Sequence, residues 1–156
     1  MSVSTIMTQP VVTIDLDESI LAARQTLAER GIRHLVVTEQ SRVVGVISDR
    51  DLLSNLSPFL GTMSERAQDL NSLKRRVHQI MSRRVRTVRP ETPLVDAALL
   101  MLEHKISCLP VVDASGQCVG VVTTRDMLIW SLRCMQGEGH PAACRLPSGE
   151  TPEAAA

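Results

Sequence analysis

The chain carries one stretch of seven residues twice. Residues 45–51 are GVISDRD, and residues 120–126 are GVVTTRD. The sequence around them repeats as well, because Ile6-Met7-Thr8 corresponds to Ile80-Met81-Ser82 at an offset of 74 residues. One extra residue near Gly116 shifts the offset to 75 for the two heptapeptides. An internal duplication of this kind means that any fold must be built from two similar units.

Each heptapeptide has the pattern of a strand that ends in a short helix. Two apolar residues suit a buried strand end, and the hydroxyl of Ser48 or Thr123 stands where a helix N-cap is expected. A helix N-terminus with free N–H groups is a favourable place for a phosphate. The closing carboxylates, Asp51 and Asp126, could accept hydrogen bonds from a ribose diol. Each copy therefore has the features of half a nucleotide site, although an N-cap and a helix-dipole partner would also explain these residues.

Both halves of the chain predict the same order of elements, β-α-β-β-α. Hydrophobic periodicity indicates helices at residues 19–30 and 93–105, and Gly31 is a plausible C-cap for the first. Short apolar runs indicate the strands. The predicted strands are residues 11–14, 35–37 and 43–47 in the first half, and 85–88, 109–112 and 119–122 in the second.

These elements predict an α+β (α/β) fold made of two tandem units. We expect repeat 1 at residues 3–56, a helical connector at 57–79, repeat 2 at 80–135 and a disordered C-terminal tail at 136–156. A unit of about 50 residues is too small to bury an adequate core alone. We therefore expect the repeats to pack together with pseudo-two-fold symmetry and to form ligand clefts where they meet.

Composition excludes several classes of function. Lys plus Arg equals Asp plus Glu at 17 each, and Phe59 and Trp130 are the only aromatic residues, so we do not expect nucleic-acid binding. No apolar run is long enough to cross a membrane. Four scattered cysteines and no secretory signal favour the cytoplasm. We find no catalytic motif and no metal-ligand spacing, and therefore expect neither an enzyme nor a metal site.

One basic stretch leaves its role open. Seven cationic residues fall between Asp69 and Glu91 with no acidic residue among them: Lys74, Arg75, Arg76, Arg83, Arg84, Arg86 and Arg89. The stretch could steer polyphosphates to a cleft, bind nucleic acid, or form a solvated face of the connector.

The repeated β-α-β-β-α order, the Ile-Met-Thr/Ser openings, residues 107–113 (SCLPVVD) and the two heptapeptides resemble tandem CBS domains, named after cystathionine β-synthase. Such a pair is often called a Bateman module. The resemblance implies a regulatory sensor that binds AMP, ADP, ATP or S-adenosylmethionine between the repeats. It implies an adenine nucleotide as regulatory ligand, no obligatory cofactor, a homodimer, and a regulated partner protein whose identity the sequence does not give.

The resemblance also implies the ligand-binding residues. The hydroxyl and the last Asp of each heptapeptide would contact phosphate and ribose, two arginines could reach phosphates, and the remaining residues would frame the base. The implied set is Thr13, Ile32, Arg33, His34, Ser48, Arg50 and Asp51 in repeat 1, and Thr87, Ile106, Ser107, Cys108, Thr123, Arg125 and Asp126 in repeat 2.

The two sites are not equivalent in sequence. Repeat 1 has Val36 where repeat 2 has Pro110, and it has the bulky pair Arg33-His34 where repeat 2 has Ser107-Cys108. These side chains could clash with a base or add contacts to a phosphate. They leave open an alternative function, in which the module keeps the fold and serves as a structural or protein-interaction subunit without a ligand.

Overall fold

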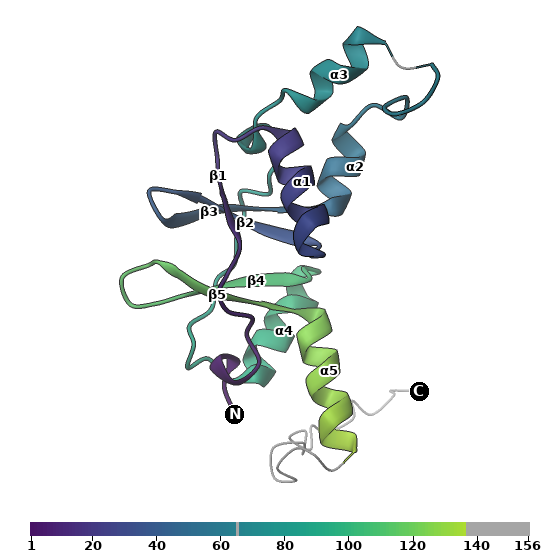
Figure 1. The fold of residues 1–156 in the computed structure, drawn as a ribbon. Coiled ribbons are helices and arrows are strands. Elements are labelled where there is room, and N and C mark those ends of the chain that lie inside the picture. The colour runs from purple at the N-terminus through teal and green to yellow at the C-terminus, as the bar shows by residue number, and fades with distance from the viewer. Residues whose placement is uncertain (65, 137–156) are drawn as a thin grey trace, which may run out of the picture.

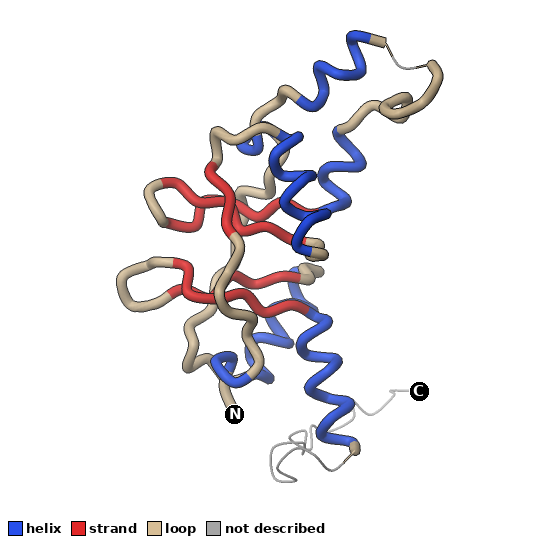
Figure 2. The backbone as a smooth tube through the Cα atoms, viewed as in Figure 1, coloured by secondary structure: helices blue, strands red, loops and turns tan. Residues whose placement is uncertain are grey.

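The computed structural model describes residues 1–64 and 66–136 of the chain. Within them, two units lie one above the other, each with a small sheet and a pair of helices beside it (Figures 1 and 2). The predicted tail lies outside the described residues, apart from Gln136. None of the described helices is both long and apolar enough to span a membrane.

The first unit follows the predicted order of elements. β1 (Thr13–Asp15) is parallel to β2 (His34–Glu39), which pairs with antiparallel β3 (Arg42–Ser48). α1 (Ile20–Arg30) and α2 (Asp49–Asn55) complete the unit. Its core is aliphatic, with Leu35, Val37 and Ile47 of the sheet fully buried against helix residues. The short apolar runs that predicted the two central strands of this unit are confirmed.

The second unit contains α4 (Leu94–His104), β4 (Cys108–Val112), β5 (Cys118–Thr123) and α5 (Thr124–Met135). Its sheet has two strands, because the strand expected at residues 85–88 is reduced to one bridge between Val88 and Val111. The prediction of this strand was wrong for an identifiable reason. In the first unit Leu16 donates its N–H to the carbonyl of Thr38, and the corresponding residue in the second unit is Pro90, which has no N–H to donate.

The helix ends differ between the repeats at one position. Gly31 ends α1 in the left-handed conformation with φ of 61°, as the sequence predicted. Lys105 holds the corresponding position after α4 with φ of 52°. A residue with a Cβ adopts this conformation at a cost that glycine does not have.

The connector is less helical than predicted. Its helical parts are α3 (Ala67–Leu73) and the short 3-10 helix η2 (Val77–Gln79), whereas the sequence predicted a helical connector over residues 57–79. Before α3 the chain turns instead, because Gly61 has a φ of 75° and the Thr62 hydroxyl donates to the carbonyl of Phe59.

The segment at the start of each repeat (residues 3–7 for repeat 1, and residues 77–81 at the end of the connector for repeat 2) packs in the core of the other repeat. The 3-10 helix η1 (Val3–Thr5) begins at Val3, whose side chain is fully buried in the second core, and the Val3 N–H donates to Thr92 at 2.9 Å. The corresponding residue Val77 is fully buried in the first core and donates to Glu18 at 2.9 Å. Figure 1 shows the N-terminal segment beside the second unit before it crosses to β1.

Two short crossing segments result from this exchange. The first strap (residues 8–14) runs from a bridge between Thr8 and Val121 to the parallel pairing of Ile14 with Val37. The second strap (residues 82–88) runs from a bridge between Ser82 and Val46 to the bridge between Val88 and Val111. The two straps correspond to each other across the duplication, which supports the predicted pseudo-two-fold relation.

The exchange explains the glycine that opens each heptapeptide. A Cβ on Gly120 would lie 2.9 Å from the Sδ of Met7, and a Cβ on Gly45 would overlap with the Sδ of Met81. The repeated Met and the repeated Gly are therefore contact partners from opposite repeats. The sequence shows both motifs, but the offset alone does not reveal that they meet.

Candidate ligand site

The predicted site residues of repeat 1 lie at one end of its sheet. Thr13 opens β1 and pairs with Val36, and His34 opens β2 opposite Ser48, the last residue of β3. Ile32 and Arg33 lead into β2, and the Arg33 carbonyl accepts the N–H of Asp49 at 3.1 Å. Arg50 and Asp51 follow in the first turn of α2.

The residues of repeat 2 lie in the equivalent place. Cys108 opens β4 opposite Thr123, the last residue of β5. Ile106 and Ser107 lead into β4, and the Ser107 carbonyl accepts the N–H of Thr124 at 3.1 Å. The remaining residues flank these strand ends: Thr87 before Val88, and Arg125 and Asp126 in the first turn of α5.

The two strand ends meet at His34 and Ser107. The Nε2 atom of His34 lies 3.0 Å from the Oγ atom of Ser107, which joins the repeats across their seam. Burial lowers the pKa of His34 below 6.5, although Asp49 and Asp51 oppose this effect. Arg33 and Arg50 lower that pKa further. His34 is therefore favoured as a neutral ring near neutral pH.

Each heptapeptide forms a capping box at the start of a helix. The Ser48 hydroxyl and N–H both donate to Oδ2 of Asp51 at 2.7 Å. Thr123 makes the same two bonds to Oδ2 of Asp126, at 2.7 and 2.8 Å. Within the described part of the chain, the Oδ1 atom of neither carboxylate receives a hydrogen bond. The capping role that the sequence suggested is present, and one acceptor oxygen of each Asp stays available.

The straps bring residues of the two repeats into the same neighbourhood. The second strap starts at Ser82, which pairs with Val46, two residues before Ser48. It ends at Thr87 and Val88 of repeat 2. The first strap starts at Thr8, which pairs with Val121, two residues before Thr123. It ends at β1 of repeat 1. Each capping box is thus adjacent to a strap that leads to the threonine of the other repeat. The sequence alone does not predict this crossing, because the duplication does not show which repeat each strap joins.

The thiols near the site are poor nucleophiles. Burial raises the pKa of Cys108 to about 12, and Cys118 and Asp126 raise it further. Burial also raises the pKa of Cys118. The side chain of Cys108, which is buried, therefore behaves as a small apolar residue. Among residues 1–64 and 66–136, no group of three or more His, Cys, Asp or Glu is placed to hold a metal ion.

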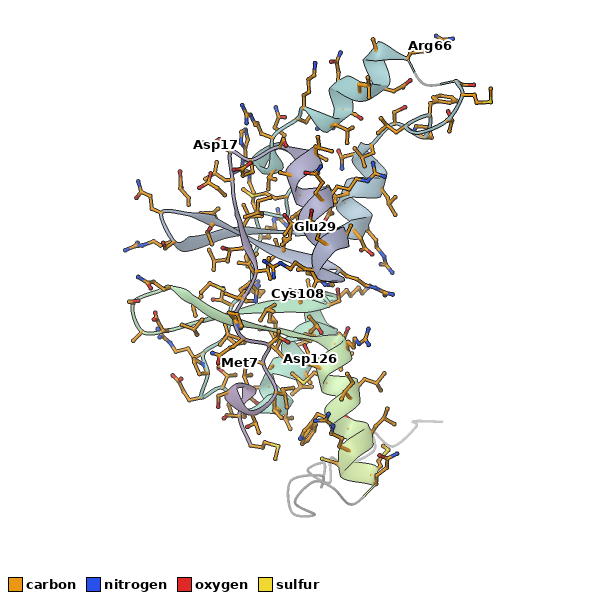
Figure 3. The ribbon with its side chains drawn as sticks, in the orientation of Figure 1. Met7, Asp17, Glu29, Arg66, Cys108 and Asp126 are labelled. Atoms are coloured by element: carbon orange, nitrogen blue, oxygen red, sulfur yellow. The ribbon has the colours of Figure 1, made fainter. Side chains whose placement is uncertain are left out.

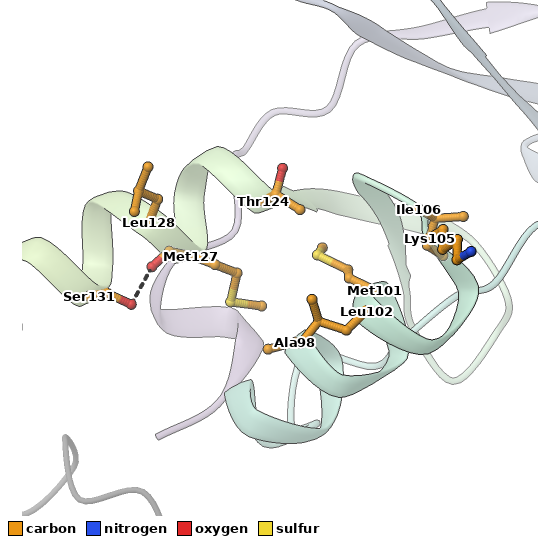
Figure 4. Close-up of a pocket in the computed structure, with 9 residues that line it drawn as sticks. All are labelled: Ala98, Met101, Leu102, Lys105, Ile106, Thr124, Met127, Leu128 and Ser131. Atoms are coloured by element: carbon orange, nitrogen blue, oxygen red, sulfur yellow. Dashed lines mark hydrogen bonds between the residues drawn. The ribbon is translucent and has the colours of Figure 1, made fainter.

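Two surface cavities lie beside the second unit. One of about 480 Å³ is formed by the apolar faces of α4 and α5, including Met101, Leu102 and Leu128 (Figure 4). The other, of about 440 Å³, lies between η1 and α5, where Asp126 and Trp130 contribute to its wall together with Met7. Figure 3 shows Met7 and Asp126 in the same unit, although they belong to different repeats in the sequence.

The fold and the site together define a tandem-repeat protein in which two similar units, each with a small sheet and two helices, join at their strand ends. The family model for the CBS domain matches residues 3–58 and 77–133. The chain therefore belongs to the CBS domain family, and it carries the domain as a tandem pair.

Known proteins agree with this assignment. A CBS domain-containing protein of Dictyostelium discoideum is 36% identical over 129 residues, which cover 81% of this chain and 88% of that protein. A homoserine O-acetyltransferase of Methanococcoides burtonii is 34% identical over 127 residues, 81% of this chain but 23% of the enzyme.

Solved structures show the same fold. The CBS domain pair of protein MJ0100, in complex with 5'-methylthioadenosine and S-adenosyl-L-methionine, has a TM-score of 0.70 and 27% identity, covering 89% of this chain and 98% of that one. CBSX2 in complex with AMP has a TM-score of 0.69 and 32% identity, covering 85% of this chain and 96% of that one.

Proposed function

We propose that the protein is a regulatory module that binds an adenosine-containing nucleotide between its two CBS repeats. The observation that carries this proposal is the pair of capping boxes, in which Asp51 and Asp126 each use Oδ2 within the protein and leave Oδ1 to accept from a ribose hydroxyl. The ligands named for MJ0100 and CBSX2, which are all adenosine compounds, support the same class of ligand.

In this proposal the predicted residues act as three groups. Ser48, Thr123 and the amide groups at the starts of α2 and α5 would face phosphate or ribose. Thr13 and Thr87, with the backbone at residues 32–34 and 106–108, would frame the base. Arg50 and Arg125, both exposed, would reach phosphates.

The ligand would act by favouring one arrangement of the repeats over another, and it can do so only through a difference in affinity for the two arrangements. We propose that the signal passes through a homodimer or to a regulated protein, with no chemical reaction at the site. The exposed apolar residues of α4 and α5, such as Leu102 and Leu128, suit such an interface. We place this module in the cytoplasm, where its cysteines would stay reduced.

Thermal melting against AMP, ADP, ATP, S-adenosylmethionine and GTP tests the proposal. A ligand at 100 times its dissociation constant should add about 2.7 kcal/mol, or about 5–10 °C for a chain of this size. Adenosine compounds should raise the melting temperature, and Asp51→Ala or Asp126→Ala should reduce the rise. No rise with any compound at millimolar concentration would contradict the proposal.

The chain supplies a matched control for the loss of a cap. Asp69 accepts the Arg66 N–H through Oδ2 at the start of α3, at 2.7 Å, just as each site carboxylate accepts the N–H of its N-cap residue, and its Oδ1 accepts from the Ser57 hydroxyl. Asp69→Ala should therefore lower stability without reducing the response to nucleotide. An equal loss of response in Asp69→Ala would show that the effect of the site variants is merely structural.

The bond between His34 and Ser107 favours a second candidate function, an interaction module without a ligand. This bond already ties the two strand ends together where a base would lie. If this candidate is correct, the Asp51→Ala/Asp126→Ala double variant keeps its partner binding, and no nucleotide changes the melting temperature.

A further inference from the structure

The two straps differ sharply in charge although they correspond in structure. The second strap carries Arg83, Arg84 and Arg86, whereas the first has Gln9, Pro10 and Val12 at the corresponding positions. Both straps bridge the same two sheets in the same way. The main difference between them is therefore that one is basic and the other is uncharged.

The second strap is fixed at both ends. Ser82 and Val46 exchange two backbone hydrogen bonds of 2.9 and 3.1 Å, and Val88 bonds to Pro110 and Val112 at 3.1 and 2.9 Å. The strap therefore begins beside the strand end that leads to the Ser48–Asp51 capping box. The backbone fixes both ends of the segment that carries the arginines, so they do not lie on a free loop.

The arginines of this strap lack acidic partners. In residues 1–64 and 66–136 the single contact within 4.0 Å between a basic side chain and a carboxylate joins His78 to Asp17, so none of these guanidinium groups has a carboxylate within that distance. Arg83 donates to the carbonyl of His78 at 3.0 Å. Arg84 and Arg86 are exposed and make no side-chain hydrogen bond within the same described ranges. Their charge is available to an anion from solution.

We infer that the Ser48–Asp51 site takes a nucleotide with a polyphosphate chain, and that Arg84 and Arg86 bind its outer phosphates. This inference rests on the proposed function and narrows its ligand class. The Thr123–Asp126 site, beside the uncharged strap, takes an adenosine compound with little or no phosphate. Guanidinium groups suit phosphate oxygens because they donate two parallel hydrogen bonds. Arg50 lies between Asp49 and Asp51 and offsets their repulsion of the phosphates.

Calorimetric titration of the whole chain with ATP and with adenosine, without divalent cations, tests the inference. At the Ser48–Asp51 site, with the other site disabled by Asp126→Ala where the two titrations overlap, the chain should bind ATP at least about tenfold more tightly than adenosine. Arg84→Gln/Arg86→Gln should bind ATP about tenfold more weakly, which corresponds to about 1.4 kcal/mol of binding free energy. Its affinity for adenosine should stay within about twofold of the wild-type value. The advantage of ATP in wild type should also shrink as salt is added.

Arg24→Gln/Arg30→Gln is the matched control, because it removes the same charge from exposed positions of α1. It should leave the ATP to adenosine ratio unchanged. Two results would overturn the polyphosphate site: equal affinities of the Ser48–Asp51 site for ATP and adenosine, or a preference for ATP that Arg84→Gln/Arg86→Gln leaves unchanged. In both cases binding of adenosine would still support the proposed function. Binding of neither compound would overturn both.

A titration with a single-stranded oligonucleotide tests whether the basic strap binds nucleic acid instead of a nucleotide. Tight binding of the oligonucleotide that disappears in Arg84→Gln/Arg86→Gln, together with an unchanged ATP to adenosine ratio, would assign the arginines to nucleic acid and overturn the inference. Weak oligonucleotide binding that is equal in wild type and variant supports it.

Discussion

The imidazole of His34 and the hydroxyl of Ser107 are 3.0 Å apart, and they are not equivalent residues of the two repeats. The counterpart of His34 is Cys108, and the counterpart of Ser107 is Arg33. The pseudo-two-fold relation is therefore broken at the point where the strand ends meet. A ligand that enters between the repeats has to accommodate this bond on one side only.

Stability should fall as the pH drops below about 6.5, and His34 should account for part of the loss. Burial lowers the pKa of His34 in the folded state, so the unfolded chain takes up the proton more readily. The contribution of the neutral ring is complete above pH 6.5, and it is lost as the pH falls from 6.5 towards the lower pKa of the folded protein. Urea denaturation at pH 7.5 and 5.5 measures the loss.

His34→Gln is the informative variant, because its amide can still donate to Ser107 but does not titrate. The difference in unfolding free energy between the two pH values should be smaller in His34→Gln than in wild type. An identical pH dependence in the two proteins would assign the acid sensitivity to other groups.

Val3→Ala should destabilise the second repeat, although Val3 precedes the first. The side chain is fully buried in the core that contains Leu109 and Val111, so its loss should cost about 2 kcal/mol. Hydrogen exchange should show the loss of protection at β4 and β5 before β2. Leu53→Ala, at an exposed position of α2, should change stability by no more than about 0.5 kcal/mol.

Gly120→Ala should destabilise the protein by about 1–3 kcal/mol, because the new Cβ forces Met7 out of its position. A double-mutant cycle with Met7→Ala checks the cause. The two substitutions should cost less together than the sum of their separate costs, since the smaller side chain makes room for the Cβ. Strict additivity would mean that another atom is responsible, the nearest being the carbonyl of Thr8.

Lys105→Gly should stabilise the protein by about 0.5–1 kcal/mol, because Lys105 has a φ of 52° that glycine adopts without strain. The same change in the opposite direction, Gly31→Lys in repeat 1, should destabilise it by a similar amount. Urea midpoints of the two variants give the comparison. Destabilisation by Lys105→Gly would show that the lysine side chain makes a contribution larger than the strain.

Local patterns predicted most of the fold. The order of elements in the first unit, the apolar runs of β2 and β3, and Gly31 at the end of α1 are properties of neighbouring residues, and the structure confirms them. The Ser48 and Thr123 caps are also local, and both are present. The shortened first strand of repeat 2 could have been predicted as well, since Pro90 stands where the ladder needs an N–H.

The relations between repeats could not be predicted in the same way. A duplication shows that Met7 corresponds to Met81 and that Gly45 corresponds to Gly120, but either pairing of Met with Gly satisfies the offset. The bond between His34 and Ser107 depends on how the two sheets lie relative to each other, and the hydrophobic periodicity of the sequence does not contain this information. Long-range contacts of this kind set the composition of the site.

The exchanged opening segments bear on how such a pair could arise. One repeat alone would present a core without its covering valine and methionine, and its own opening segment would have no core to enter. Two separate copies could satisfy each other only by exchanging these segments as a dimer. Joining the copies in one chain converts that exchange into an intramolecular event at an effective concentration in the millimolar range. The duplication of this sequence therefore has the arrangement expected of an ancestral exchanged dimer that became covalently fixed.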